Sequence, residues 1–415
     1  MFDILPAFKN ENEGYITIPA MKHFLKSKNL KIGEDRSDML TSILEYAYKS
    51  QHNENDVLIW LDSVLREGQK EIHVKRIRLN RKTEELFSSD EKVEALFNPH
   101  EKDSTNHVST FSYSPTFSYI KHEISNTKIG QQYSVILGKQ LYCQNPDFTH
   151  RVIPYIVIID IYPDISFIIG RAKPKANLYK YDGKAFDPEQ HRAIEAGNLI
   201  EEAITKVVDL LGCEELKKAE AVSFFGNSLY NIVEEYTQTP DEIRDILETK
   251  QEMLNDLVRT YQTEFCLNSV DNHLDVTSDV RNLAEKYLSV NWPDTDIFTR
   301  GRRAYPTKLS ATDEEESKVD QRSGLEKPLQ SKSIFFDNKR TLEKNRSCDS
   351  AQFCYNRANT KYFGPDFKVA ITISRTKNYI TVKFPDYTQE EDIQDVLLEV
   401  IKSGTNPVLG SDKPS

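Results

Sequence analysis

Apolar residues form a near-continuous run typical of strands in the middle of this chain, and they recur at helical spacing in most other parts. The most apolar stretch spans residues 151–181, where Ile, Val, Tyr and Phe dominate. Runs of β-branched and aromatic residues interrupted by a turn pair are typical of strands. We therefore expect a β-hairpin of Tyr155–Tyr162 and Ile165–Lys173, joined at Pro163-Asp164. Its near-continuous apolarity predicts a central position, with both faces covered.

Helical spacing dominates most of the remaining pattern. Apolar residues spaced three and four apart predict helices within 187–212, 239–266 and 278–288. Near the C-terminus, two alternating segments at 367–373 and 379–384 precede a helical stripe at 393–401. The fold class expected from this order is α+β. It has a small helical N-terminal module, a central antiparallel sheet with a helical layer, and a C-terminal β-β-α unit.

Breaks in these patterns divide the 415 residues into expected segments. They are a helical module with a basic arm (1–82), a linker (83–110), a central α+β domain (111–299), an irregular connector (300–358), the β-β-α unit (359–404) and a tail (405–415).

Composition narrows the class of protein. Hydrophobic residues make up 38% and charged residues 29% of the chain, and the net charge is −11. This balance argues against a chain coated by nucleic acid overall, although local basic patches can still bind. No apolar run is long enough to span a membrane and the first residues lack signal-peptide features, so we expect a cytoplasmic protein without a membrane partner. The five cysteines lack metal-ligand spacing and no phosphate loop occurs, so we expect reduced thiols, no metal and no cofactor.

Residues 16–43 predict two short helices separated by an extended link. Met21, Phe24 and Leu25 share one helical face, Leu30 follows the turn, and a second helix begins at Ser37. The arrangement resembles the SAP (helix-extension-helix) family. The family pattern is matched by Ile18 and Met21 at its opening, Phe24 and Leu25 at its buried pair, Leu30 after the turn, Arg36 at its basic position, and Met39 with Ile43 in the second helix.

The match departs from that family at three positions. Asn29 replaces a Gly, Gly33 is displaced by one position, and Ser42 replaces the usual Arg. The resemblance implies DNA binding through helix N-termini and a few basic side chains that contact phosphates. Relatives of this shape that are LEM-like bind protein, so a helical hairpin that packs on a protein neighbour is the alternative.

A basic segment, EIHVKRIRLNRK, follows the expected module at residues 71–82. We interpret it as an arm that contacts phosphates beside the helices. The alternative is a solvated edge strand, because edge strands are often protected by Lys and Arg. The residues expected to bind DNA are Arg36, Lys75, Arg76, Arg78, Arg81 and Lys82.

One part of the hairpin superficially resembles the PD-(D/E)XK nuclease signature. Pro163-Asp164 precedes Arg171-Ala172-Lys173, and the catalytic candidates on this hypothesis are Asp160, Asp164 and Lys173. Two carboxylates must hold the divalent ion, yet Arg171 occupies the second position, where a cation repels metal. In the expected register Asp160 lies opposite Phe167, and Asp164 is more simply a turn residue.

These observations favour a DNA-associated, non-catalytic binding or regulatory protein. A metal-dependent nuclease with an atypical site is one alternative. A protein-interaction subunit of a larger assembly, such as a prokaryotic defence or mobile-element system, is another. In that case a second copy or a protein partner is expected on the C-terminal unit, and an exposed apolar patch on the 393–401 helix would favour it.

Overall fold

The computed structural model describes residues 4, 6–9, 15–100, 107–108, 111–145, 147–265, 275–312, 318–324, 327–358 and 364–405. The fold is of the α+β class, as expected, with helices and antiparallel strands in both parts of the chain. Two compact units divide it. Unit 1 comprises Met1–Val222, Arg357–Phe367 and Ser374–Leu398, and unit 2 comprises Ser223–Asn356, Lys368–Ile373 and Glu399–Ser415.

Unit 1 contains one large antiparallel sheet and most of the N-terminal helices. Its helices are α1 (Pro6–Lys9), α2 (Ile18–Ser27), α3 (Arg36–Ala47), α4 (Gln51–Arg66), α5 (Arg81–Leu86), α6 (Asp90–Phe97) and α7 (Ala196–Leu211). Its strands are β1 (Lys70–Arg78), β2 (Ser118–Asn126), β3 (Gln131–Gln144), β4 (His150–Tyr162), β5 (Phe167–Ala172), β6 (Leu178–Lys180), β7 (Ala193–Ile194), β8 (Glu214–Glu215) and β13 (Ile380–Phe384). The strand order is β13-β1-β5-β4-β3-β6-β7, with β2 also paired to β3 and β8 to β1.

The central hairpin is confirmed as β4 and β5, but the expected register is wrong. Asp160 pairs with Ile169 instead of Phe167. The reason is the turn, which is longer than two residues. Pro163–Ile165 form a 3-10 turn, and Ser166 adopts a left-handed conformation with φ of 60° before the strand begins at Phe167.

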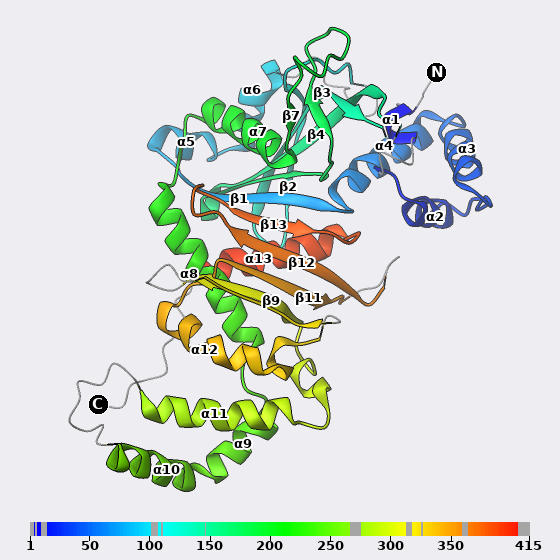
Figure 1. The fold of residues 1–415 in the computed structure, drawn as a ribbon. Helices are drawn as coiled ribbons and strands as arrows, with labels where there is room; N and C mark the ends of the chain where they lie inside the picture. Colours follow the sequence, from blue (N-terminus) through cyan, green and yellow to red (C-terminus); the bar gives the residue numbers. More distant parts are fainter. Residues whose placement is uncertain are drawn as a thin grey trace. The chain divides into compact units, whose positions relative to one another are not determined.

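Both faces of this hairpin are covered, as the continuous apolar run predicted. Successive residues of β4 point to opposite faces. Val157 and Ile159 join the core beneath α7, whereas Ile156 and Ile158 join the core beneath α2, α3 and α4. Figure 1 shows α7 crossing the strands on one side of this sheet. A strand between two apolar layers needs no polar alternation, and this explains the pattern.

The linker expected at 83–110 is wrong over its first part, which is helical. Residues 81–100 form α5, α6 and a short 3-10 turn, Asn98–His100. Val93 and Phe97 are buried in the same core as α7. The polar sequence misled because these short helices expose most of their residues and bury a narrow stripe.

Unit 2 holds a smaller set of strands and the remaining helices. Its elements are α9 (Asp241–Thr249), α10 (Gln251–Glu264), α11 (Val276–Val290), β9 (Ala304–Thr312), β10 (Lys318–Arg322), α12 (Ser333–Asn345), β11 (Ser350–Asn356) and most of β12 (Asp366–Ile373), with α8 (Lys218–Tyr236) and α13 (Glu390–Thr405) containing the unit boundaries. Its strands follow the order β10-β9-β11-β12. The expectation of an irregular connector at 300–358 is therefore wrong, because two strand pairings and a helix form there.

A further expectation in unit 2 needs correction, because the single helix expected over 239–266 is divided into α9 and α10 at Lys250. The assembly alternative predicted an exposed apolar patch on the 393–401 helix. In α13, Ile393 and Val396 are instead fully covered. In the part of the chain that the structure describes, no helix is long and apolar enough to cross a membrane.

Candidate functional site

The basic residues expected on an exposed arm lie on β1, which is a central strand flanked by β13 and β5. The arm interpretation is wrong for Lys75, which is 2% exposed. Its ammonium lies 2.6 Å from a carboxylate oxygen of Glu201 on α7 and 2.9 Å from one of Glu215 on β8. Lys75 faces α7 because odd-numbered residues of β1 share that side, and its charge is neutralised there. The edge-strand alternative is also wrong.

The other residues expected to bind DNA either contact groups within this chain or lie exposed at the surface. Arg36 donates to the backbone carbonyls of Ile16 at 2.7 Å and Lys9 at 3.2 Å. Arg78 pairs with Glu220 at 2.5 Å, and the exposed Arg81 lies 3.4 Å from Glu85. Arg76 is half-buried above the ring of Phe167, and Lys82 is exposed. Arg36 is thus engaged within the protein, whereas Arg78, Arg81 and Lys82 remain at the surface.

A histidine next to Lys75 belongs to the same buried network. The Nδ1 atom of His73 lies 2.9 Å from Glu201, its Nε2 atom lies 3.5 Å from Glu71, and its ring stacks on Tyr379. Burial acts to raise the pKa of Glu201, but the hydrogen bond with His73 and the charge of Lys75 outweigh it and lower that pKa. Each charge in the network therefore has a counter-charge, as a structural ion network requires.

The nuclease candidates occupy the opposite face of the sheet, and they are not assembled as a metal site. Asp160 is 1% exposed and lies 2.5 Å from Arg171 and 3.3 Å from Arg66. Ser134 and Gln132 donate to the same carboxylate. Asp164 is exposed on its turn, and Lys173 lies over the ring of Tyr15.

Arg171 pairs in turn with Glu390 at 2.6 Å, so Asp160 and Arg171 are both held within a buried ion network. Among the described residues, no group of three or more His, Cys, Asp or Glu side chains is placed to hold a metal ion. The arrangement gives the nuclease hypothesis no support.

A stripe of exposed apolar residues lies on α10. Met253, Leu257, Tyr261 and Phe265 are each between 51% and 63% exposed. Their spacing of four residues makes one stripe along the helix. Leu254 and Val258, on the adjacent face, are buried. The apolar surface of α10 is therefore wider than the part that the rest of unit 2 covers.

Helix α11 carries a matching stripe. Leu283, Tyr287 and Val290 are between 40% and 64% exposed, at spacings of four and three residues. The two helices pack against each other and run antiparallel in Figure 1. We call these seven residues, Met253, Leu257, Tyr261, Phe265, Leu283, Tyr287 and Val290, the α10–α11 surface.

The core beneath the α10–α11 surface is small. Its buried members are Ile243, Leu247, Leu254, Ile297 and Phe298. The sequence had marked Met253, Leu254, Leu257, Val258 and Tyr261 together as the apolar face of one helix. Periodicity identifies an apolar face but not how much of it is covered, so the exposed stripe could not be separated from the buried one.

No family model, no curated protein and no solved structure matches this chain.

Proposed function

We propose that this protein is a protein-binding component of a larger assembly and that the α10–α11 surface holds an amphipathic helix of a partner. The supporting observation is the group of seven large apolar side chains that are exposed on two helices in contact with each other. Monomeric proteins rarely expose contiguous apolar patches of this kind without a partner. Burial of each such side chain contributes roughly 1.5–3 kcal/mol before the cost of ordering is subtracted.

The charges around this surface identify the chemistry of the partner. Residues 241–264, which form α9 and α10, contain seven acidic residues and three basic ones. Asp256 and Glu264 lie three residues from Met253 and Tyr261 and therefore border the stripe. In α11, Asp279 and Glu285 are balanced by Arg281 and Lys286, so the acidic excess lies on α9 and α10, and a second copy would bring two such acidic segments together. A helix with an apolar face and flanking Lys or Arg has complementary charge, and this is the occupant that we propose.

Two peptides test this proposal. One is a short amphipathic helix of Leu and Lys, and the other has Glu in place of every Lys. Fluorescence polarisation should report binding of the Lys peptide and at least tenfold weaker binding of the Glu peptide. The double variant Leu257→Ser and Tyr261→Ser should lose the Lys peptide. Both side chains are already exposed, so circular dichroism should show an intact fold.

Ile59→Ser is the matched control, because Ile59 is 58% exposed on α4 of unit 1. This variant should bind the Lys peptide as the wild type does. Equal affinity for both peptides, or full binding by the double variant, contradicts the proposal. A stable dimer in light scattering that the double variant loses would assign the surface to a second copy instead.

DNA binding by the N-terminal module is the second candidate. The observation that supports it is the order of elements over residues 18–47, where α2 is followed by a short link without helix or strand and then by α3. Lys22 and Lys26 are exposed one turn apart on α2, and Lys31 is exposed in the link. These lysines are better placed for phosphate contacts than the residues of β1.

A salt titration of duplex binding tests this candidate. The triple variant Lys22→Gln, Lys26→Gln and Lys31→Gln should flatten the dependence of log K on log salt by about 2–3 units, at about 0.9 per phosphate contact. The control, Arg244→Gln, Lys250→Gln and Arg259→Gln, makes the same change of charge on unit 2 and should leave the slope unchanged. No binding by the wild type at ~50 mM salt, or equal slopes for both variants, contradicts DNA binding through this module.

A further inference from the structure

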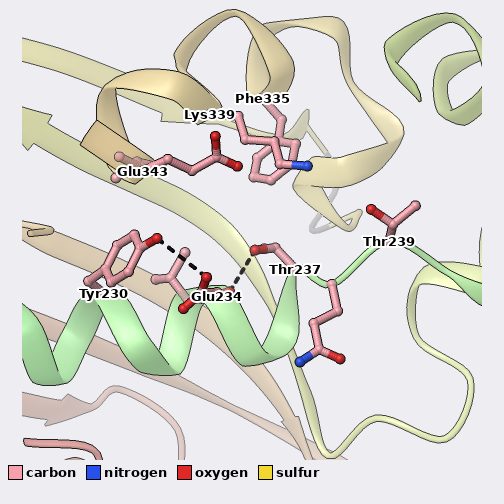
Figure 2. Close-up of a pocket in the computed structure, with 10 residues that line it drawn as sticks. Tyr230, Glu234, Thr237, Thr239, Phe335, Lys339 and Glu343 are labelled. Atoms are coloured by element: carbon pink, nitrogen blue, oxygen red, sulfur yellow. Dashed lines mark hydrogen bonds between the residues drawn. The ribbon is translucent and has the colours of Figure 1, made fainter. Parts of the chain in front are cut away.

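A cavity of about 180 Å³ lies within unit 2, between α8 and α12. Figure 2 shows α8 along one wall and α12 along the other. Its volume lies between that of an apolar cavity able to hold benzene, roughly 150 Å³, and the lower limit for drug-sized ligands, about 300 Å³. A short side chain or a small organic molecule matches this size. The cavity is separate from the seven residues of the α10–α11 surface.

The deep part of the cavity is aromatic and aliphatic. Phe335 is 1% exposed, Leu342 is 5% exposed and Tyr230 is 7% exposed. The hydroxyl of Tyr230 points to Glu234 and lies 3.4 Å from its carboxylate, which is long for an O–H···O bond. The rings of Phe335 and Tyr230 offer faces that attract cations.

Carboxylates stand on both walls of the cavity. Glu234 extends from α8 and Glu343 from α12 (Figure 2). Burial raises the pKa of Tyr230 to about 12. The charges of Glu234 and Glu343 act in the same direction, and the charge of Arg346, which does not line the cavity, acts against them. The phenol therefore stays neutral beside two acidic groups, and the cavity favours a positive charge over a negative one.

Lys339 also lines the cavity, but its positive charge is already paired with a carboxylate other than Glu234 and Glu343. The ammonium of Lys339 lies 2.8 Å from Glu285, which is 5% exposed. The hydroxyl of Thr239 donates to the other oxygen of Glu285 at 2.6 Å. Lys339 is thus held at the far end of the cavity by its own counter-ion, and Figure 2 shows its ammonium directed away from Glu343.

We propose that this cavity binds a small organic cation, a primary alkylammonium group of about four to six heavy atoms, whose volume suits the space. The alkyl part packs on Phe335 and Leu342. The ammonium group lies near the rim, between Glu234 and Glu343, and the ring of Tyr230 adds a cation–π contact. Such a group is present in free aliphatic amines and in lysine side chains of peptides, and these two sources share the chemistry that the cavity recognises.

Isothermal titration calorimetry with n-butylamine and n-pentylamine tests this proposal, with n-butanol and butyrate as size-matched controls at matched ionic strength. The amines should bind, whereas the alcohol and the carboxylate should bind at least tenfold more weakly. Glu234→Gln should weaken amine binding at least tenfold, equivalent to about 1.4 kcal/mol. A lysine-containing peptide that binds more tightly than either free amine would identify a protein side chain as the source.

Glu235→Gln is the matched control, since Glu235 makes the same charge change on the same helix, is exposed and does not line the cavity. It should leave amine affinity unchanged. If circular dichroism shows that Glu234→Gln fails to fold, Glu343→Gln on the opposite wall decides the question in its place. Binding of n-butanol as tight as that of n-butylamine, no binding of either amine, or no loss in the folded glutamate variant would overturn the proposal.

Discussion

Helix α7 and the pair α10–α11 make opposite use of an apolar stripe. Leu199, Ile200, Ala203 and Ile204 of α7 are completely buried against the sheet of unit 1. On α10, by contrast, Leu254 and Val258 are buried while Met253, Leu257, Tyr261 and Phe265 are more than half exposed. Both helices are amphipathic in sequence, but only α7 has its apolar face fully covered within the chain. This difference is the observation behind the partner helix that we propose for the α10–α11 surface.

Charged residues also differ between the two regions, because several are buried in unit 1 whereas those on α10 are exposed. In unit 1, Lys75, Asp160 and Arg171 are buried and each has a counter-charge within hydrogen-bond distance. On α10 the charged residues are exposed, and Arg259 pairs with Asp256 as a surface pair. Buried ion pairs are sensitive to the loss of one partner, whereas surface pairs contribute little. The two regions should therefore respond very differently to substitution.

The largest expected effect comes from breaking the buried network of unit 1. Arg171→Met leaves Asp160 buried with only Arg66 as a nearby cation, and we expect a loss of about 3–5 kcal/mol in the free energy of unfolding. Denaturant unfolding followed by circular dichroism measures it. Arg259→Met, which breaks a surface pair on α10, should cost less than ~1 kcal/mol. Equal losses in the two variants would remove the distinction between the regions.

A matched pair of apolar truncations sharpens the same comparison. Ile200→Ala in α7 removes a completely buried side chain and should cost about 2–5 kcal/mol. Leu257→Ala in α10 removes a side chain that is 51% exposed, and its cost should stay within about 0.5 kcal/mol. Chemical denaturation of both variants provides the measurement. A loss at Leu257 as large as that at Ile200 would mean that the stripe is covered within the free chain.

Much of the fold followed from the sequence because strong periodicity is local. The apolar run of β4 and β5, the stripe of α7 and its end at Gly212, whose φ is 65°, were all predictable. The sequence pattern did not predict elements that are short and mostly exposed, because such elements carry few apolar residues. Helices α5 and α6 bury few side chains, and the strands within 300–358 interrupt a polar sequence. Their pairing depends on residues distant along the chain.

The sites were less predictable for a related reason. Lys75 and Arg76 are adjacent in a basic run, yet the alternation of β1 sends Lys75 toward Glu201 and Arg76 to the other face. Charge in sequence therefore did not indicate exposure. The cavity between α8 and α12 combines Tyr230 with Phe335, more than a hundred residues apart, and no local motif marks such a pairing.

The smallest effect expected here is a pH dependence from Lys70, which is 5% exposed on β1. Burial, with the charges of Lys173 and Arg171, lowers the pKa of Lys70 to about 7. Between pH 7 and roughly 10 the unfolded chain keeps a proton that the folded chain has lost, so this group adds stability as pH rises. Below pH 7 its charge must be buried, which costs stability.

Lys70→Met removes that cost and should stabilise the protein by about 1–3 kcal/mol at pH 6, with the gain shrinking toward pH 10. Melting temperatures of both proteins across this pH range provide the check. A gain independent of pH would show that Lys70 is not the titrating group.

Site-specific photo-crosslinking in the native host tests the central claim about the α10–α11 surface most directly. A photoreactive phenylalanine analogue replaces Tyr261 or, as the control, Ile59, and the adducts are sequenced by mass spectrometry. We expect an adduct specific to position 261 whose captured segment has apolar residues at helical spacing and an excess of Lys and Arg. An adduct with this chain itself, with an acidic segment, or equally at both positions would contradict the account.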